Sequence, residues 1–189
     1  MKRKMMLLLS LISLTTLVSI NALAATIEFS ADFSMTLAGG KAMTGKSFVK
    51  GDKIRNELLV MGQTSITIAR QDKRFAWVLI PAAKQYREMP MKYDPAHPTP
   101  DMPFDTKEIG KDKVNGYDCK LVQLTFKNPE YGMVVNWMAT QLNMPVRVQV
   151  KKKDGTLVMT IDYSNIKVGS QPDSLFEIPA GYSKMDTKE

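Results

Sequence analysis

The sequence is poor in the side chains on which most enzyme and metal sites depend. Its 189 residues include one histidine, His97, and one cysteine, Cys119. Zinc sites need three or four His, Cys or carboxylate ligands, and we find no GxSxG, HExxH, P-loop or GxGxxG motif. Asp and Glu occur mainly at turns and at outward positions of the predicted strands. We therefore expect no enzyme activity, no catalytic residue, no cofactor and no zinc site.

The lone cysteine also excludes an internal disulfide, so a hydrophobic core must stabilise the fold. Cys119 lies among alternating apolar residues, which favours a buried structural thiol over a reactive one. The formal net charge is +7, and it falls to +4 if Lys2, Arg3 and Lys4 are removed with the N-terminal segment. This mildly basic, scattered charge is not typical of a nucleic-acid-binding protein, and we expect no nucleic-acid partner.

The N-terminal segment has the three parts of a secretory signal peptide. Three basic residues are followed by an apolar run over 5–20 and then by Ala22-Leu23-Ala24, the small-residue pattern of a cleavage site. We predict a cleaved signal peptide over 1–24, a mature chain over 25–189 that forms one domain, and a periplasmic location. The alternative is an uncleaved membrane anchor, for which the apolar run is short, since a spanning helix needs about 20 residues.

The mature chain is dominated by strand patterns. Apolar residues occupy alternate positions from Ile27 to Leu37, with polar residues between them, which predicts a long half-buried strand. Asn115-Gly116 marks a tight hairpin, and Asp173 is a candidate N-cap for one helical turn. We predict eight to eleven strands and almost no helix. The further strands are expected over 43–51, 53–62, 64–70, 74–80, 84–89, 107–114, 117–126, 133–139, 145–152 and 156–166.

A proline-rich segment, residues 90–104, interrupts the strand pattern. Five prolines in this stretch remove backbone donors and fix φ, so we predict neither strand nor helix there. Strand patterns resume after it, which indicates an insertion within one domain. We predict a flap that directs Met91, Met102 and Phe104 towards the sheet; a surface loop without function is the alternative.

Two stretches resemble the periplasmic lipoprotein-carrier superfamily, which includes LolA-type carriers, LolB-type receptors and RseB-type sensors. They are RFAWVLIPAAKQYREM at 74–89 and the last third of the chain over 143–185, which ends in DSLFEIPAGY at 173–182. The VNGYDC hairpin at 114–119 is similar to that of an uncharacterised exported branch of the superfamily. The resemblance implies one curved antiparallel sheet, an unclosed half-barrel, with a hydrophobic concave face on which carriers hold acyl chains. The sequence departs from the carrier pattern in two ways. The mature chain begins directly in a strand, without the usual N-terminal helix, and the proline-rich segment takes the place of the lid helices.

The candidate ligand residues are apolar side chains that share a strand face and include several aromatics and methionines. Methionine suits irregular or changing partners because it is unbranched and polarizable. An ordinary core beneath a lid is the alternative for the same residues. The predicted cleft residues are Phe29, Phe33, Met35, Phe75, Trp77, Leu79, Met133, Val135 and Trp137.

We accordingly expect an exported binding protein that holds an acyl chain, a lipid or a lipidated protein, for transport or sensing in the cell envelope. One alternative is an envelope structural or protein-interaction module without a lipid ligand. A second is a periplasmic copper-binding protein, because thioether and imidazole groups suit Cu(I); its ligands would be Met89, Met91, His97 and Met102.

Overall fold

The computed structural model describes residues 28–40, 42–60, 62–90, 103–128, 130 and 132–185. The predicted signal peptide and residues 91–102 of the proline-rich insertion, including Met91 and Met102, lie outside these residues. Within them, the chain is almost entirely β-strand, with three short 3-10 helices, η1 (Gln71–Lys73), η2 (Pro81–Ala83) and η4 (Asp173–Phe176).

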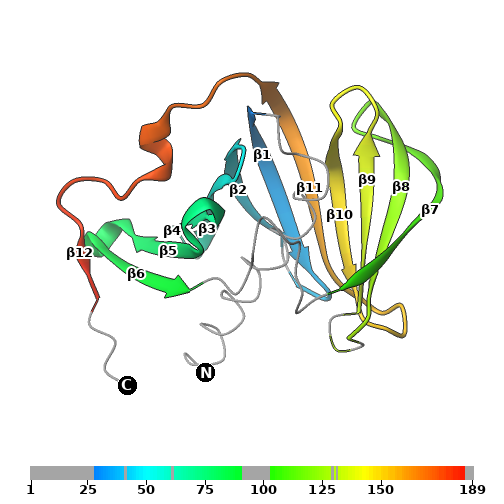
Figure 1. Cartoon of the computed structure of the whole chain (residues 1–189), viewed down its shortest axis with the longest axis horizontal. Helices are drawn as coiled ribbons and strands as arrows, with labels where there is room; N and C mark the ends of the chain where they lie inside the picture. Colours follow the sequence, from blue (N-terminus) through cyan, green and yellow to red (C-terminus); the bar gives the residue numbers. More distant parts are fainter. Residues whose placement is uncertain are drawn as a thin grey trace. The chain divides into compact units, whose positions relative to one another are not determined.

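Twelve strands form one sheet in the order β12-β6-β5-β4-β3-β2-β1-β11-β10-β9-β8-β7 (Figure 1). Neighbouring strands from β1 to β6 and from β7 to β11 pair in antiparallel fashion, whereas β12 pairs in parallel with β6. The strands are β1 (Glu28–Leu37), β2 (Ala42–Lys50), β3 (Lys53–Val60), β4 (Gln63–Arg70), β5 (Phe75–Ile80), β6 (Gln85–Pro90), β7 (Phe104–Val114), β8 (Tyr117–Phe126), β9 (Met133–Ala139), β10 (Met144–Lys151), β11 (Leu157–Val168) and β12 (Ser183–Lys184).

The predicted fold class, a mainly β chain with one curved antiparallel sheet that does not close into a barrel, is confirmed. Three local expectations differ. The strand count is higher by one because the two-residue β12 pairs with β6. Pro90 ends β6 and Phe104 begins β7, so both ends of the predicted insertion belong to strands. Asp173 is not an N-cap: Pro172 holds that position, and the Asp173 carboxylate instead bonds two lysine side chains.

Local turn chemistry explains much of the strand order. Asn115 and Gly116 both have positive φ, 50° and 84°, which is the geometry of a type I′ hairpin turn and joins β7 to β8. The turn after β5 is η2, which ends at Lys84 in the left-handed region, with φ 48°. These turns set the register of the strands that follow them.

The described residues fall into two compact units, which we treat separately. The β1–β6 unit holds residues 28–36, 40–90 and 163–185, and therefore includes β12 and the C-terminal half of β11. The β7–β11 unit holds residues 37–39 and 103–162.

The register of the β1–β6 unit gives it two apolar faces. Residues directly opposite in an antiparallel pair point to the same side of the sheet. Phe29 pairs with Val49, and Val49 pairs with Ile54, which places them on one side, which we call the Phe29 face. Its buried apolar residues are Phe29, Ala31, Phe33, Met35, Val49, Ile54, Leu58, Ala69 and Ala76. The opposite side, the Trp77 face, carries Phe48, Ile66, Ile68, Phe75, Trp77 and Leu79.

The β7–β11 unit also has two distinct faces. Asn136 pairs with Val148, and Val148 pairs with Ile161, on a side we call the Val148 face. Its buried apolar residues are Leu124, Phe126, Val134, Met138, Val146, Val148, Val150, Met159 and Ile161. The opposite side, the Trp137 face, alternates apolar with polar side chains: Met133, Val135 and Trp137 lie opposite Lys151, Gln149 and Arg147.

Candidate functional site

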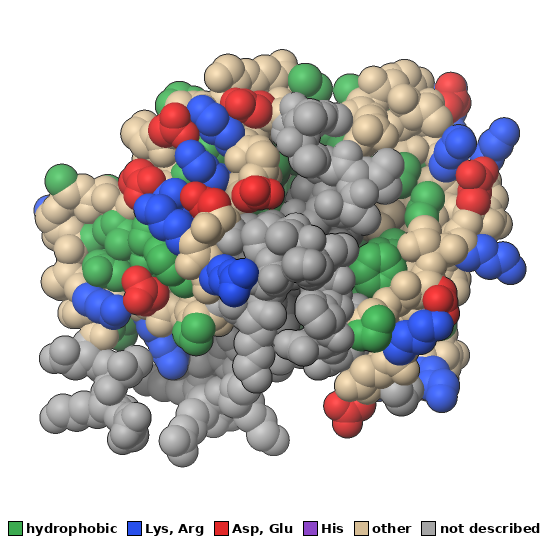
Figure 2. Space-filling view, in the orientation of Figure 1, with side chains coloured by type: hydrophobic (Ala, Val, Ile, Leu, Met, Phe, Trp, Pro, Cys, Tyr) green, Lys and Arg blue, Asp and Glu red, His purple; other side chains and the backbone are tan. Residues whose placement is uncertain are grey.

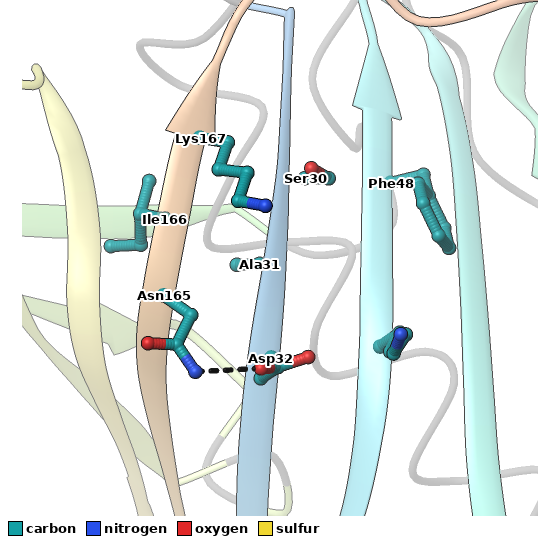
Figure 3. Close-up of a pocket in the computed structure, with 8 residues that line it drawn as sticks. Ser30, Ala31, Asp32, Phe48, Asn165, Ile166 and Lys167 are labelled. Atoms are coloured by element: carbon teal, nitrogen blue, oxygen red, sulfur yellow. Dashed lines mark hydrogen bonds between the residues drawn. The ribbon is translucent and has the colours of Figure 1, made fainter.

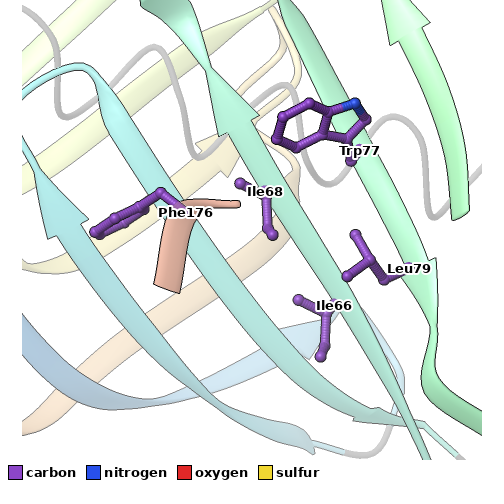
Figure 4. Close-up of a cluster of buried hydrophobic side chains, with 5 residues drawn as sticks. All are labelled: Ile66, Ile68, Trp77, Leu79 and Phe176. Atoms are coloured by element: carbon purple, nitrogen blue, oxygen red, sulfur yellow. The ribbon is translucent and has the colours of Figure 1, made fainter. Parts of the chain in front are cut away.

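The C-terminal segment 171–185, which we call the strap, covers the Trp77 face. Phe176 in η4 is fully buried and packs against Ile66, Ile68, Trp77 and Leu79 (Figure 4). Leu175, Ile178 and Tyr182 of the strap pack on the same cluster. The predicted residues Phe75, Trp77 and Leu79 therefore belong to a core that the strap fills.

Ionic and polar contacts fix the strap at its N-terminal end. The Asp173 carboxylate accepts a hydrogen bond of 2.7 Å from Lys53 Nζ and lies 3.3 Å from Lys50 Nζ. These two lysines hold the pKa of Asp173 below its usual value, Lys53 contributing first. Lys50 Nζ also donates to the Gln171 carbonyl at 3.1 Å, and the Gln171 N–H donates to Glu28 Oε2 at 2.7 Å.

Two buried arginines hold the middle of the strap. Arg55 Nη1 donates to the Leu175 carbonyl at 3.0 Å, and Arg70 Nη1 donates to the Phe176 carbonyl at 3.3 Å. Arg70 is 4% exposed and forms ion pairs with Asp72 and with Glu177 of the strap. The hydrogen bond from Arg70 is the main cause that lowers the pKa of Asp72. A buried guanidinium is tolerated only when it is paired and hydrogen-bonded, so these contacts make the strap a fixed part of the fold.

The strap ends on the edge of the sheet. Ser183 and Lys184 pair in parallel with Gln85 and Tyr86 of β6. Lys184 Nζ donates to Glu88 Oε1 at 3.0 Å, while Trp77 Nε1 donates to Glu88 Oε2 at 3.1 Å. Both bonds lower the pKa of Glu88, that from Lys184 more strongly. The strand side chains that hold the strap in these contacts all point to the Trp77 face.

Three of the predicted cleft residues, Phe29, Phe33 and Met35, lie on the opposite side, on the Phe29 face. They are 1%, 8% and 1% exposed. Phe33 faces Gly45 across β1 and β2, and a Cβ at Gly45 would stand 2.6 Å from Phe33 Cζ. The glycine therefore makes room for the aromatic ring, which also lies 6.3 Å from the Tyr163 ring. The result is a buried apolar face along β1 to β3.

The last three predicted residues, Met133, Val135 and Trp137, lie on the Trp137 face of the other unit. Trp137 Nε1 donates to Asp112 Oδ2 at 2.9 Å, and the Arg147 guanidinium lies over the indole ring at 5.8 Å. Arg147 Nε in turn donates to Asp162 Oδ1 at 2.5 Å. The bond from Trp137 is the first cause that lowers the pKa of Asp112. This tryptophan is held by polar neighbours on an amphipathic face.

The nine predicted cleft residues therefore lie on three different sheet faces, and within the β1–β6 unit the two triplets point in opposite directions. Phe104, predicted for the flap, is instead in β7, where its ring contacts Phe126 edge-on at 5.9 Å. The other flap residues, Met91 and Met102, are outside the described part of the chain.

The prediction did not include the residues of the Val148 face. The sequence pattern that could have identified them is apolar–polar alternation. In β10, polar side chains alternate with Val146, Val148 and Val150. In β11, they alternate with Met159, Ile161 and Tyr163. Strand β9 concealed this pattern, because six of its seven residues are apolar and burial extends to both of its faces. Periodicity alone cannot assign a face to such a run.

The candidate copper ligands lie mostly outside the described residues. Met89 lies in β6, while the other candidate copper ligands Met91, His97 and Met102 fall outside the described part. Among the residues that the structure describes, no group of three or more His, Cys, Asp or Glu side chains is placed to hold a metal ion. Cys119 is 3% exposed, and burial raises the pKa of its thiol.

An open pocket of about 440 Å³ lies between β11, β1 and β2 in the β1–β6 unit. Figure 3 shows the hydrogen bond across it from Asn165 Nδ2 to Asp32 Oδ2, which measures 2.8 Å. Asn165 adopts a left-handed conformation with φ 49°. The pocket is lined by Ser30, Ala31, Asp32, Lys46, Phe48, Asn165, Ile166 and Lys167. Its lining combines Ala31, Phe48 and Ile166 with charged and polar side chains, whereas the predicted cleft is lined by apolar residues alone.

The surface charge is mixed in sign. Figure 2 shows Lys and Arg side chains interspersed with Asp and Glu over the visible face, with hydrophobic side chains between them. Surface charges form ion pairs, as in Lys113 with Asp118 and Lys120 with Glu108. None of the described segments forms a helix that is long and apolar enough to cross a membrane.

Comparison with known proteins gives one family and several similar folds. A family model described as a domain of unknown function, DUF4412, matches residues 30–144. No curated protein sequence matches this chain. The structure is similar to an uncharacterized conserved protein from Thermus thermophilus, with a TM-score of 0.65 and 12% identity over 93% of this chain and 98% of that chain.

The structure is also similar to MucB. In the Pseudomonas aeruginosa MucA/MucB complex the match has a TM-score of 0.56 and 16% identity, and it covers 86% of this chain and 58% of that chain. A structure of MucB gives 0.55 and 16%, with 88% and 62% covered. This chain thus spans about three fifths of MucB, and the likeness concerns the fold alone. The predicted resemblance to the LolA/RseB-like superfamily is confirmed at that level.

Proposed function

Because this chain belongs to the DUF4412 family and has a LolA/RseB-like fold, we propose that it is a periplasmic binding protein for an acyl chain. The chain would be that of a lipid or a lipidated protein, held for transport or sensing in the cell envelope. The protein would bind it on one of the two apolar sheet faces that the strap does not use, the Phe29 face or the Val148 face.

The observation that carries this proposal is that the strap packs on one apolar face, while two others, the Phe29 face and the Val148 face, have buried side chains that the strap's side-chain contacts do not explain. The strap's contacts with the strands of its own unit lie on the Trp77 face, opposite Phe29 and Val49. In the β7–β11 unit, the buried residues of the Val148 face are 9% exposed or less, and the described elements of that unit are strands and turns of one sheet. A sheet with an apolar face needs another element or a ligand against it.

Burial of apolar groups is enough to provide the free energy for binding an acyl chain, and no catalytic group is required. Burial of one CH₂ group contributes about 0.8 kcal/mol, so a chain of about 16 carbons would gain roughly 12 kcal/mol before the costs of immobilisation. Phe29, Phe33 and Met35 of the Phe29 face and the valines of the Val148 face are buried apolar side chains of the kind against which such a chain would pack. Either surface would therefore suffice to hold an acyl chain.

Native mass spectrometry tests the proposal directly. The mature protein would be purified gently from a bacterial periplasm and weighed before and after extraction with organic solvent, then offered hexadecanoate and phospholipid. We expect a bound mass that extracts as lipid, or uptake of an added lipid. A protein that stays bare under all of these conditions would contradict the proposal, and an added mass of one copper would support the metal alternative instead.

Matched substitutions on one strand identify the face. In β1, Ala31→Trp fills the Phe29 face, while Ser30→Trp places the same side chain on the opposite side of the strand. In β10, Val148→Trp and Gln149→Trp form the equivalent pair for the other unit. We expect one inward substitution to weaken lipid uptake by at least tenfold while its neighbour leaves uptake unchanged, with circular dichroism confirming that each variant is folded. Equal uptake by all four variants would exclude both faces.

A second candidate is an envelope protein-interaction module, and the likeness to MucB favours it. The solved structures of MucB include complexes with MucA. Crosslinking in the periplasm would test this role: a single protein recovered with the chain, together with no lipid in native mass spectrometry, would replace the lipid proposal. A lipidated protein recovered through its acyl chain would support the first proposal.

A further inference from the structure

Asn136 is a polar residue in the middle of an apolar face. It is the central residue of β9 and pairs with Val122 of β8 and Val148 of β10. Its neighbours on the same side of β9, Val134 and Met138, are 2% and 9% exposed, and Asn136 itself is 2% exposed. The amide therefore points into a surface of valine and methionine side chains.

The side-chain oxygen of Asn136 has no hydrogen-bond partner within the described structure. Nearly all buried polar atoms in folded proteins have one, and a buried acceptor without a donor lowers stability. The neighbouring side chains on β9 are those of Val134 and Met138, which carry no strong donor, and the backbone N–H groups of a central strand are used by the ladder. A leucine at this position would have nearly the same shape and would leave no unpaired acceptor.

On the basis of the proposed lipid-binding function, we propose that Asn136 determines specificity by accepting a hydrogen bond from the ligand. The bound chain must then carry a donor within its apolar body. A hydroxyl group on an acyl chain or the N–H of an amide-linked acyl chain meets this requirement, whereas a plain saturated chain does not, and an ionised terminal carboxylate has no proton to donate. The site is therefore selective for hydroxylated or amide-linked acyl chains, bound on the Val148 face.

Competitive binding to the mature protein tests the inference with three probes of equal chain length: hexadecanoate, a mid-chain hydroxyhexadecanoate and N-hexadecanoylglycine. We expect the wild-type protein to prefer the hydroxylated or the amide-linked probe to plain hexadecanoate by about fivefold to tenfold, the worth of one buried hydrogen bond. The probe that gains distinguishes a hydroxyl from an amide donor. In Asn136→Leu the preference should disappear while hexadecanoate binds at least as tightly. Gln149→Leu, on the opposite side of β10, should keep the wild-type preference.

The other possible outcomes of this experiment would each overturn a specific part of the proposal. Equal binding of all three probes by the wild-type protein would overturn the role of Asn136 and leave the lipid-binding function standing. Binding of none of them would overturn both. Because Asn136→Leu removes an unsatisfied acceptor, it should melt at or above the wild-type temperature; a variant that fails to fold would show that the amide has a structural partner and would also reject the inference.

Discussion

The strap offers the sharpest test of how this fold is stabilised. Phe176 is fully buried between η4 and the Trp77 face, where it contacts Ile68, Trp77 and their neighbours. Replacing it with alanine removes an aromatic ring from a packed site and leaves a cavity, which costs about 3–5 kcal/mol in protein cores. For a chain of this length, each kcal/mol corresponds to roughly 2–4 °C in melting temperature. We therefore expect Phe176→Ala to lower the melting temperature by about 6–20 °C.

The assay is denaturant unfolding followed both by circular dichroism and by tryptophan fluorescence. In a Trp137→Phe background, the remaining tryptophan, Trp77, reports on the cluster that Phe176 completes. We expect both signals to change in one transition, because Arg55 and Arg70 tie the strap to the sheet. Val168→Ala is the matched control: this side chain is 59% exposed, and its truncation should change stability by less than about 0.5 kcal/mol.

Two results would refute this reasoning. A loss of less than about 1 kcal/mol in Phe176→Ala would show that the strap contributes little to the fold. A separate early transition of Trp77 fluorescence, before the loss of the dichroism signal, would show that the strap leaves the sheet on its own and is a movable cover over the Trp77 face.

Two other predictions concern β2 and the pH dependence of stability. Gly45→Ala should destabilise the protein by several kcal/mol in denaturant unfolding, because the new Cβ would clash with the Glu57 backbone oxygen and with the Phe33 ring. The clash with the backbone oxygen remains when Phe33 is truncated. A Phe33→Ala, Gly45→Ala double variant that is as stable as Phe33→Ala alone would therefore contradict this explanation. The pKa of Asp72 is lowered in the folded protein by Arg70, so its ionised form stabilises the fold at neutral pH, and this contribution is lost as the pH falls below about 4 through the lowered value. Melting temperatures of the wild-type protein and Asp72→Asn should therefore converge between pH 5 and pH 2 (about the range of the carboxyl titration), and a constant difference would reject the role of this carboxylate.

Prediction from the sequence was successful where local pattern decides structure. The alternation in β1 fixed which residues share a side, because neighbouring side chains of a strand point to opposite faces. Asn115-Gly116 likewise specified its hairpin, since few residue pairs adopt two positive φ values. Prediction was weaker at the strand ends: Pro90 and Phe104 are in strands because an edge position tolerates proline and because Phe104 gains a ring contact with Phe126.

The candidate site could not be assembled from the sequence for a specific reason. Each apolar triplet was correctly grouped within its own strand, but the sequence does not say which side of one strand matches which side of the next. The register from β2 to β5 decides that Phe29 and Trp77 point in opposite directions. The sequence also does not show which face Asn136 lies on. Every other residue of β9 is apolar, so the strand has no alternation from which a face could be assigned.

The sequence by itself thus determined the secondary structure, the resemblance of the fold and the scarcity of catalytic side chains, since these depend on composition and on neighbours along the chain. Only the tertiary structure decided which apolar face the strap seals and which polar groups are left without partners. Those properties arise from contacts between residues more than 100 positions apart, such as Arg70 with Phe176. Such contacts depend on the register between strands and on the path by which the C-terminal strap comes back to the sheet. No local periodicity in the sequence encodes either of these.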